Sequence, residues 1–284
     1  MITMKGAAVS AKLKEQVEKG LETLTWVPKL TIIRVGENPD DISYEKGATK
    51  KLTSFGLEVE SKVFPGDISD EAFKKEFAAI NADASVDGIL MLRPLPKQIN
   101  EQDIEKMIDP AKDLDGISPV NIAKVFSGDT SGFAPCTAEA VVCMLKMNDI
   151  ALSGKRVAVV GRSMVVGRPL SMLLLHENAT VPICHSRTAN LPEVCREADI
   201  LTACVGKAAM INHTYVKKDA VVIDVGINVD ENGKLCGDVD FADLDGTASA
   251  ATPVPGGVGG VTTAVLAQHL VRAARMKQEK NSNK

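Results

Sequence analysis

Short apolar runs alternate with segments of helical spacing along the whole chain. Apolar runs of four to seven residues predict buried strands, and a 3.6-residue period of apolar positions predicts amphipathic helices. The expected strands are residues 30–36, 57–63, 88–92, 156–160, 180–183, 200–204 and 220–225. The expected helices of the first half are residues 7–24, 44–55 and 70–81. This alternation predicts an α/β fold with two doubly wound domains.

The apolar run at 157–160 leads into a glycine-containing turn that predicts a dinucleotide site. The turn has the pattern G-x-S-x-x-x-G, and a leucine-rich helical segment follows it. A strand, turn and helix in this order direct backbone N–H groups and the positive helix end toward a pyrophosphate. The pattern differs from G-x-G-x-x-G by one residue and one substitution. The candidate cofactor residues of the turn are Gly161, Arg162, Ser163, Val166 and Gly167.

The end of the strand expected at 180–183 bears on which dinucleotide is bound. An NAD site has an Asp or Glu about 20 residues after its glycines, where it binds the ribose 2′-hydroxyl. Here His185, Ser186 and Arg187 follow the strand, and no acidic residue stands among them. A hydroxyl and a guanidinium, with Arg162 in the preceding turn, suit the 2′-phosphate of NADP better. NADP is therefore the expected cofactor, with Ser186 and Arg187 as candidate ligands, and NAD use stays open.

Composition narrows the class of protein. A chain of 284 residues suits two ordinary domains, and its net charge of −4 gives no broad basic surface for nucleic acid or an anionic membrane. The N-terminus lacks the apolar segment of a signal peptide, and no apolar run approaches the roughly 20 residues of a membrane span. The six cysteines form no C-x-x-C pair. We therefore expect a soluble cytoplasmic protein with reduced thiols. His185 has no second ligand at a useful spacing, so no metal site is expected.

Two further helices define the expected domain border. A helix at 137–147, with Thr137 as its N-cap, lies near the border, and a last helix at 262–276, with Thr262 as a candidate cap, can return to the first domain. The polar residues after it are expected to form a frayed tail. The resulting assignment is a discontinuous first domain, residues 1–143 and 262–284, and a Rossmann-like dinucleotide-binding domain, residues 144–261.

Several short motifs occur in a fixed order along nearly the whole chain. They are Asp41-Ile42-Ser43-Tyr44, Lys112-Asp113-Leu114-Asp115-Gly116, Pro135-Cys136-Thr137, the turn at 161–167, Cys184-His185-Ser186, Asp224-Val225-Gly226, Gly237-Asp238-Val239 and Thr252-Pro253-Val254-Pro255-Gly256-Gly257-Val258-Gly259. With this ordered set the chain resembles the methylenetetrahydrofolate dehydrogenases, which are usually bifunctional as dehydrogenase and cyclohydrolase. The resemblance implies a folate-binding catalytic first domain, an NADP-binding second domain, a cleft between them and a homodimer.

The resemblance also implies roles for individual residues. Tyr44 would stack on the aminobenzoate of the folate, as an aromatic face can. Asp115 would accept hydrogen bonds from the pterin, and its charge would favour the cation that forms during the reaction. The turn of Pro255, Gly256 and Gly257 would let the backbone approach the substrate closely.

The family pattern breaks at two positions. The family usually carries a lysine four residues after the tyrosine and a glutamine two residues before Pro-Leu-Pro, where this chain has Ala48 and Leu92. Hydride transfer from 5,10-methylenetetrahydrofolate to NADP removes no proton, so it requires alignment and exclusion of water rather than a base. Hydrolysis of the methenyl product requires a positioned acid–base group. We therefore expect a dehydrogenase that yields 5,10-methenyltetrahydrofolate and has weak or absent cyclohydrolase activity.

Two alternatives stay open at this point. A fully bifunctional enzyme could use another proton shuttle; Lys46 and Lys50 each lie two residues from Ala48 and would point about 160° away from it around a helix. A non-catalytic dinucleotide-binding regulatory protein is an alternative of another class. Tyr44 and Asp115 argue against it, because a nucleotide sensor needs no folate site.

Overall fold

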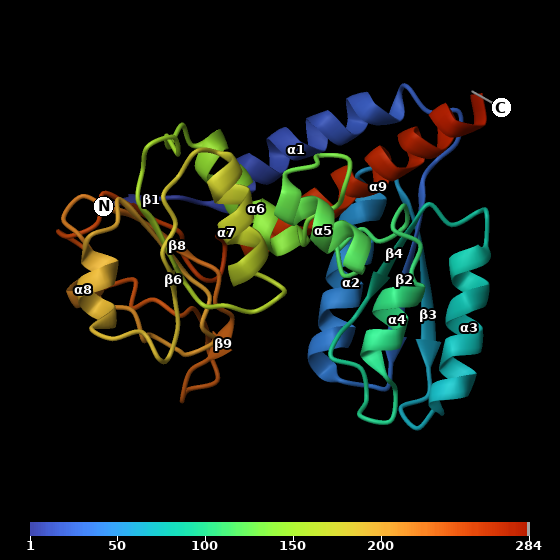
Figure 1. Ribbon diagram of the computed structural model, residues 1–284, viewed down its shortest axis with the longest axis horizontal. Helices are drawn as coiled ribbons and strands as arrows, with labels where there is room; N and C mark the ends of the chain where they lie inside the picture. Colours follow the sequence, from blue (N-terminus) through green and yellow to red (C-terminus); the bar gives the residue numbers. More distant parts are fainter. Residues whose placement is uncertain (283–284) are drawn as a thin grey trace. The chain divides into compact units, whose positions relative to one another are not determined.

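Two separate parallel sheets organise the chain, each in a unit of its own (Figure 1). The computed structural model describes residues 1–282. The six-strand unit consists of Met1–Lys12 and Pro135–Thr262, and the three-strand unit consists of Leu13–Ala134 and the chain from Thr263 onward. Helices α1 (Gly6–Leu21) and α9 (Gly259–Ser282) each contain residues of both units. The two-domain α/β fold expected from the sequence is confirmed.

The units divide the chain at other residues than the sequence suggested. The divisions fall after residues 134 and 262, rather than after 143 and 261. Residues 1–12 belong to the six-strand unit, whereas the sequence placed them in the first domain. The physical reason for the last difference is strand pairing. Strand β1 (Ile2–Thr3) pairs in parallel with β11 (Ala250–Ala251), and the Met4 amide donates to the Ala251 carbonyl at 2.8 Å.

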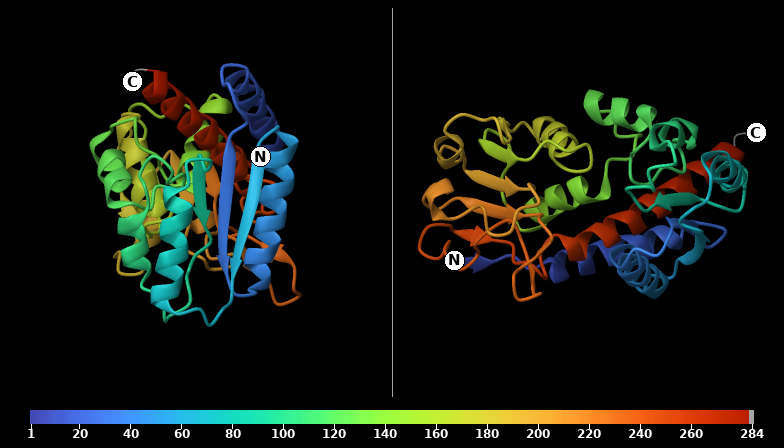
Figure 2. Two further views of the ribbon diagram at one scale, coloured as in Figure 1. Left: turned by 90° about the vertical axis from the view of Figure 1, so that its right-hand side faces the viewer. Right: turned by 90° about the horizontal axis from the view of Figure 1, so that it is seen from below.

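The three-strand unit has the sheet order β3-β2-β4, and both pairs are parallel. Its strands are β2 (Lys29–Val35), β3 (Glu58–Phe64) and β4 (Gly88–Met91), and its other helices are α2 (Pro39–Ser54), α3 (Asp70–Ala82), α4 (Glu101–Met107) and α5 (Pro119–Ser127). Figure 2 shows α2 on one face of the sheet and α3 on the other. Phe73 and Phe77 of α3 are fully buried against Ile33 and Ile89, so this face forms the core.

The six-strand unit has the sheet order β1-β11-β8-β7-β5-β6, and all its pairs are parallel. Its remaining strands are β5 (Val157–Val160), β6 (Ile183–Cys184), β7 (Ile200–Ala203) and β8 (Val221–Asp224), and its remaining helices are α6 (Cys136–Met147), α7 (Gly167–His176), α8 (Leu191–Arg196) and the 3₁₀ turn η1 (His213–Tyr215). A small antiparallel pair, β9 (Asn228–Val229) and β10 (Leu235–Cys236), lies outside the sheet. Every residue of β5, β7 and β8 is buried, which explains why all of them except Thr202 and Asp224 are apolar.

Strand order reverses beside β5, since β6 follows it on one side and β7 on the other. In open parallel sheets, ligands bind outside the carboxyl ends of the strands at such a reversal. The carboxyl end of β5 is where the glycine turn begins. The fold therefore places this turn at the position that favours a bound ligand.

Several element boundaries differ from the expectations. Helix α2 begins at Pro39, five residues early, because the Asn38 side chain accepts the Asp40 amide at 3.0 Å and caps it. Helix α6 begins at Cys136 after Pro135, so Thr137 is not an N-cap. Helix α9 begins at Gly259 and continues to Ser282, so Thr262 is not a cap and the expected frayed tail is wrong as far as residue 282. Residues 283–284 of that tail lie outside the described residues. None of the helices described between residues 1 and 282 is long and apolar enough to cross a membrane.

Candidate functional site

The glycine turn after β5 is built so that only glycine fits two of its positions. Gly161 has φ +135°, and a Cβ added to it would lie 2.2 Å from the Cys204 carbonyl oxygen. A Cβ on Gly167, the first residue of α7, would lie 2.2 Å from the Gly161 carbonyl oxygen. The Ser163 hydroxyl accepts the Val166 amide at 3.1 Å and closes the turn. The start of a ten-residue helix is thus packed against the strand end, which is a geometry that binds phosphate.

The end of β6 lies directly beside this turn. The Gly161 amide donates to the Cys184 carbonyl at 2.9 Å, so the two strand ends are neighbours. His185 holds the loop, because its Nδ1 accepts the Arg187 amide at 3.1 Å and its own amide donates to the Thr188 hydroxyl at 2.8 Å. The side chains of Arg162, Ser186 and Arg187 are all exposed. The structure therefore brings the expected cofactor residues together on one edge of the sheet. Among residues 1–282, no cluster of three or more His, Cys, Asp or Glu side chains could hold a metal.

The turn of Pro255, Gly256 and Gly257 belongs to the same six-strand unit. Gly256 has φ +100°, and its carbonyl accepts the Gly6 amide at 2.9 Å. A Cβ on Gly6 would lie 2.2 Å from the Gly257 carbonyl oxygen. The turn is therefore fixed by the first residue of α1 and requires no side-chain chemistry of its own.

The three-strand unit carries the other expected site residues. Tyr44 and Ala48 lie four residues apart on α2 and thus on one helix face; the Tyr44 side chain is 39% exposed and Ala48 only 2%. Leu92 follows β4, donates its amide to the Ile33 carbonyl at 2.9 Å, and is 9% exposed. Ala48 and Leu92 are therefore both apolar and buried in this chain.

Asp115 lies in a loop that continues alongside β4. The Ile89 amide donates to the Lys112 carbonyl at 2.7 Å, and Ile89 forms a parallel bridge with Asp113. The chain segments that lead to Leu92 and Asp115 are therefore parallel neighbours. Asp115 itself is half-buried.

The two aspartates of this loop have different surroundings. Asp113 is buried and accepts the amides of Ile117 at 3.0 Å and Ser118 at 2.8 Å and the side-chain amide of Asn121 at 2.9 Å. Asp113 therefore stabilises this turn through local hydrogen bonds. From α9, the ring Nδ1 of His269 bonds the Leu114 carbonyl at 2.7 Å, which fixes the same loop.

One lysine near Ala48, Lys51, was not identified from the sequence. Lys46 and Lys50 are exposed, as expected for residues that point away from Ala48. Lys51 is three residues from Ala48, hence on its face, and it is half-buried. Burial lowers the pKa of Lys51 from its ordinary value. The i, i+3 spacing was the signal in the sequence that could have identified it.

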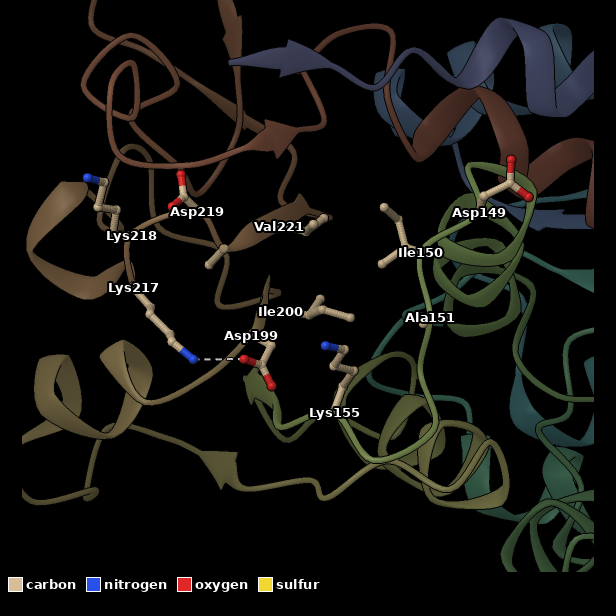
Figure 3. A pocket seen from close by; sticks show the side chains of 11 residues that line it. Asp149, Ile150, Ala151, Lys155, Asp199, Ile200, Lys217, Lys218, Asp219 and Val221 are labelled. Carbon is tan, nitrogen blue, oxygen red and sulfur yellow. Dashed lines mark hydrogen bonds and ion pairs between the residues drawn. The ribbon is translucent and has the colours of Figure 1, made fainter.

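A cavity of about 480 Å³ opens at the opposite edge of the six-strand sheet (Figure 3). Its lining includes Lys155 before β5, Ile200 at the start of β7 and Val221 at the start of β8, and Lys217 bonds Asp199 at 2.8 Å across its rim. These residues mark the amino ends of the strands. The cavity is therefore separate from the carboxyl edge, where the glycine turn lies.

The fold and the turn together define a two-domain α/β protein with a dinucleotide-binding unit. Residues 135–278 match the family profile described as the NAD(P)-binding domain of tetrahydrofolate dehydrogenase/cyclohydrolase, and residues 4–115 match the profile of its catalytic domain. The chain belongs to the tetrahydrofolate dehydrogenase/cyclohydrolase family. The family resemblance seen in the sequence is thereby confirmed, whereas the meaning of Ala48 and Leu92 stays a prediction.

Individual relatives agree with this assignment. The bifunctional protein FolD of Clostridium kluyveri is 49% identical over 281 residues, which cover 98% of this chain and 99% of the relative. The crystal structure of the bifunctional FolD from Campylobacter jejuni superimposes with a TM-score of 0.94 at 36% identity and covers 98% of this chain and 99% of its own. The enzyme of Trypanosoma brucei, solved with NADP cofactor and inhibitor, has a TM-score of 0.91 at 29% identity, with 98% of both chains covered.

Proposed function

We propose that this protein is an NADP-dependent methylenetetrahydrofolate dehydrogenase with weak or absent cyclohydrolase activity. It would transfer a hydride from 5,10-methylenetetrahydrofolate to NADP and release 5,10-methenyltetrahydrofolate. Family membership supports the first part. The observation that carries the second part is that Ala48 and Leu92, both buried and apolar, replace the two side chains that would handle protons and water.

NADP suits the residues on the carboxyl edge of the six-strand sheet. The close packing of Gly161 and Gly167 leaves a backbone cradle at the start of α7 that fits a pyrophosphate. Arg162, Ser186 and Arg187 supply two guanidinium groups and a hydroxyl for a 2′-phosphate, and the NADP-bound structure of the Trypanosoma brucei relative agrees with this choice. When bound, the nicotinamide would supply the hydride acceptor. NAD remains a second, weaker cofactor, since the absence of an acidic ligand does not forbid it.

In the three-strand unit, we assign the folate to Tyr44 and Asp115. The exposed Tyr44 ring offers a face on which the aminobenzoate can stack. Asp115 would accept hydrogen bonds from the pterin and stabilise the positive charge that develops as the hydride leaves. No residue in this scheme has to remove a proton.

We also propose that the protein forms a homodimer in the cytoplasm. Strand β3 lies at the edge of the three-strand sheet, and Val63 on it is 50% exposed. An edge strand has unpaired N–H and C=O groups, with which a strand of a second copy can pair. The six cysteines are all free, as is usual for proteins of a reducing compartment.

The test is to follow methenyltetrahydrofolate by its absorbance after adding methylenetetrahydrofolate and NADP to purified protein. We expect the methenyl compound to accumulate and to decay only at the uncatalysed rate of the buffer. Rapid enzyme-dependent decay would refute the loss of cyclohydrolase activity. Absence of any methenyl formation with either cofactor would favour the non-catalytic regulatory alternative instead.

A fully bifunctional enzyme is the second candidate, and Lys51 is the observation that favours it. This lysine shares a helix face with Tyr44 and Ala48, and burial lowers its pKa, which makes its proton easier to release. If the wild-type protein hydrolyses the methenyl compound, Lys51→Met should abolish hydrolysis and preserve hydride transfer. The matched control, Lys50→Met, changes an exposed lysine on another face of α2 and should alter neither rate.

A further inference from the structure

Two buried carboxylates, which the proposed chemistry does not use, join the loops that follow β7 and β8. Asp224 is the last residue of β8 and is 3% exposed, and Asp238, which follows β10, is fully buried. One Asp224 carboxylate oxygen accepts the amides of Gly226 and Asp238, both at 3.0 Å. The other oxygen accepts the Val239 amide at 3.0 Å. Asp224 thus holds the backbone on both sides of Asp238 in place.

Asp238 in turn binds three consecutive backbone amides after β7. One of its oxygens accepts the amides of Val205 at 2.6 Å and Gly206 at 3.1 Å, and the other accepts the Lys207 amide at 2.8 Å. The side-chain amide of Asn228 donates a fourth bond at 3.0 Å. Successive amides around one anion form the type of nest that usually holds a bound phosphate. Here the anion is part of the chain, so the nest fixes a loop.

Two glycines make this arrangement possible. A Cβ on Gly226 would lie 2.3 Å from the Asp238 carboxyl carbon, and a Cβ on Gly237 would lie 1.8 Å from an Asp224 carboxylate oxygen. Asp238 therefore fills the space that a side chain at Gly226 would need. In the same way, Asp224 fills the space that a side chain at Gly237 would need. The D-x-G and G-D-x motifs of the sequence are halves of one interlocked unit.

The segment held by Asp238 lies on one side of the glycine turn. The Cys204 amide donates to the Val160 carbonyl at 2.9 Å. The Cys204 carbonyl oxygen is the atom with which a Cβ on Gly161 would clash. Strand β6, with Ser186 and Arg187, lies on the other side of β5. A dinucleotide spans such a reversal of strand order. Its adenosine half lies on the side where residues at the strand end bind the ribose. The nicotinamide half would then lie over the β7 side.

We propose that Asp238, itself held by Asp224, is a positioning residue that fixes the 205–207 segment against the nicotinamide half of the dinucleotide. The proposal rests on the proposed function, since it assumes that NADP binds at this edge. Its consequence is selective: loss of the Asp238 carboxylate releases the segment on the nicotinamide side, whereas the turn at 161–167 and the loop at 185–187 keep their own hydrogen bonds.

Two ligands distinguish binding of the adenosine half of the cofactor from binding of the whole cofactor. Adenosine 2′,5′-bisphosphate carries the adenosine and its 2′-phosphate without the nicotinamide, and NADP carries both halves. The variant Asp238→Asn keeps the size of the side chain but removes one acceptor and the charge. The matched control is Asp199→Asn at the amino end of the same strand β7, where the carboxylate accepts the Arg156 amide at 3.0 Å.

Calorimetric titration of both probes decides the question. In Asp238→Asn, we expect the Kd for NADP to rise at least about tenfold, as for the loss of one or more bonds to a charged group. The Kd for the bisphosphate should change less than about twofold, and Asp199→Asn should leave the ratio of the two constants unchanged even if its melting temperature falls. Equal weakening of both probes, or weakening of neither, overturns the proposal. Failure of both probes to bind the wild-type protein overturns the proposed cofactor site itself.

A milder variant covers the case in which Asp238→Asn does not fold, as judged by circular dichroism. Asn228→Ala removes one donor to Asp238 and leaves the carboxylate and its three amides in place. It should shift the ratio of the two dissociation constants in the same direction by a smaller factor. An unchanged ratio in a folded Asn228→Ala protein would then overturn the proposal.

Discussion

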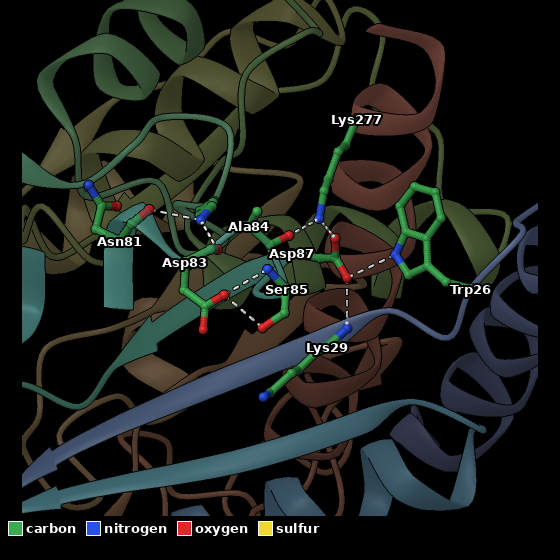
Figure 4. Close-up of polar contacts among 9 residues, drawn as sticks. Trp26, Lys29, Asn81, Asp83, Ala84, Ser85, Asp87 and Lys277 are labelled. Carbon is green, nitrogen blue, oxygen red and sulfur yellow. Dashed lines mark hydrogen bonds and ion pairs between the residues drawn. The ribbon is translucent and has the colours of Figure 1, made fainter. Parts of the chain in front are cut away.

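An ion pair between Lys277 of the C-terminal helix α9 and the buried Asp87 predicts a specific loss of stability. Lys277 of α9 donates to a carboxylate oxygen of Asp87 at 2.6 Å and to the Ala84 carbonyl at 2.6 Å (Figure 4). The other oxygen of Asp87 accepts the Trp26 indole N–H at 3.1 Å and the Lys29 amide at 2.9 Å. The Asp87 side chain is 1% exposed, whereas that of Lys277 is 33% exposed.

The substitution Lys277→Met keeps the length of the side chain and removes the charge. Removing one partner of a buried pair costs about 3–5 kcal/mol, because the other charge stays buried without compensation. Here two N–H donors remain on Asp87, and water can reach the partly exposed position of the ammonium. We therefore expect a loss of about 2 kcal/mol in the free energy of unfolding of the three-strand unit, close to the contribution of a hydrogen bond to a charged group.

Urea unfolding followed by tryptophan fluorescence measures this loss directly. Trp26 is the single tryptophan of the chain and bonds Asp87, so its signal reports the three-strand unit. With a slope of about 2 kcal/mol/M, the midpoint should fall by about 1 M. The control Lys280→Met alters an exposed lysine one turn further along α9 and should move the midpoint by less than a quarter of that. Equal midpoints for the two variants, or an undiminished effect of Lys277→Met in an Asp87→Asn background, would refute the reasoning.

Four further outcomes follow from the site. Arg187→Ala should weaken NADP binding by about 1.5–3 kcal/mol and leave NAD binding nearly unchanged, as titration of both cofactors would reveal. Asp115→Asn should slow hydride transfer by orders of magnitude while NADP still binds, and near-normal turnover would remove Asp115 from the mechanism. The double change Ala48→Lys with Leu92→Gln should restore some decay of the methenyl compound, more than Ala48→Lys alone, because a lone buried lysine lacks its partner. Burial raises the pKa of Asp224 from 3.8 to about 6, so the folded chain binds more protons than the unfolded chain between those values. Stability from this group is therefore present below pH 4 and lost by pH 6, and the stability of wild type relative to Asp224→Asn should fall by about 3 kcal/mol from pH 4 to pH 7 in urea titrations.

The sequence predicted the elements that have a strong period and missed those that do not. The buried strand at 157–160 is a continuous apolar run and that at 200–203 is apolar except for Thr202, and the structure has both within one residue of expectation. The first turn of α2 has no clear apolar period, so its start was indicated only by the N-cap Asn38, whose side chain accepts the Asp40 amide. The strands β1 and β11 have two residues each, too few for any period, and their pairing joins the N-terminal segment to a segment far along the chain.

Prediction of the site residues was likewise restricted to patterns that are local in the sequence. The glycine turn and the motifs around Asp115 are local in sequence, so they could be recognised before the fold was known. Asp224 and Asp238 appear in the sequence only as members of two short motifs, because only the fold shows that both are buried and that Asp224 accepts the Asp238 amide. Lys51 differs again: its helical spacing was available, but its burial depends on side chains that pack around it from elsewhere in the chain.

The burial of Ala48 and Leu92 determines how easily proton transfer could be introduced at these two positions. Had Ala48 and Leu92 been exposed, a water molecule or a neighbouring lysine could take over proton transfer with little rearrangement. At 2% and 9% exposure, both are part of the packed interior, and an ammonium placed there must lose its hydration. A single reversion therefore costs stability before it can contribute to hydrolysis, whereas the lysine and glutamine together can satisfy each other. The proposed loss of cyclohydrolase activity should therefore be reversed only by both changes together, and not by either one alone.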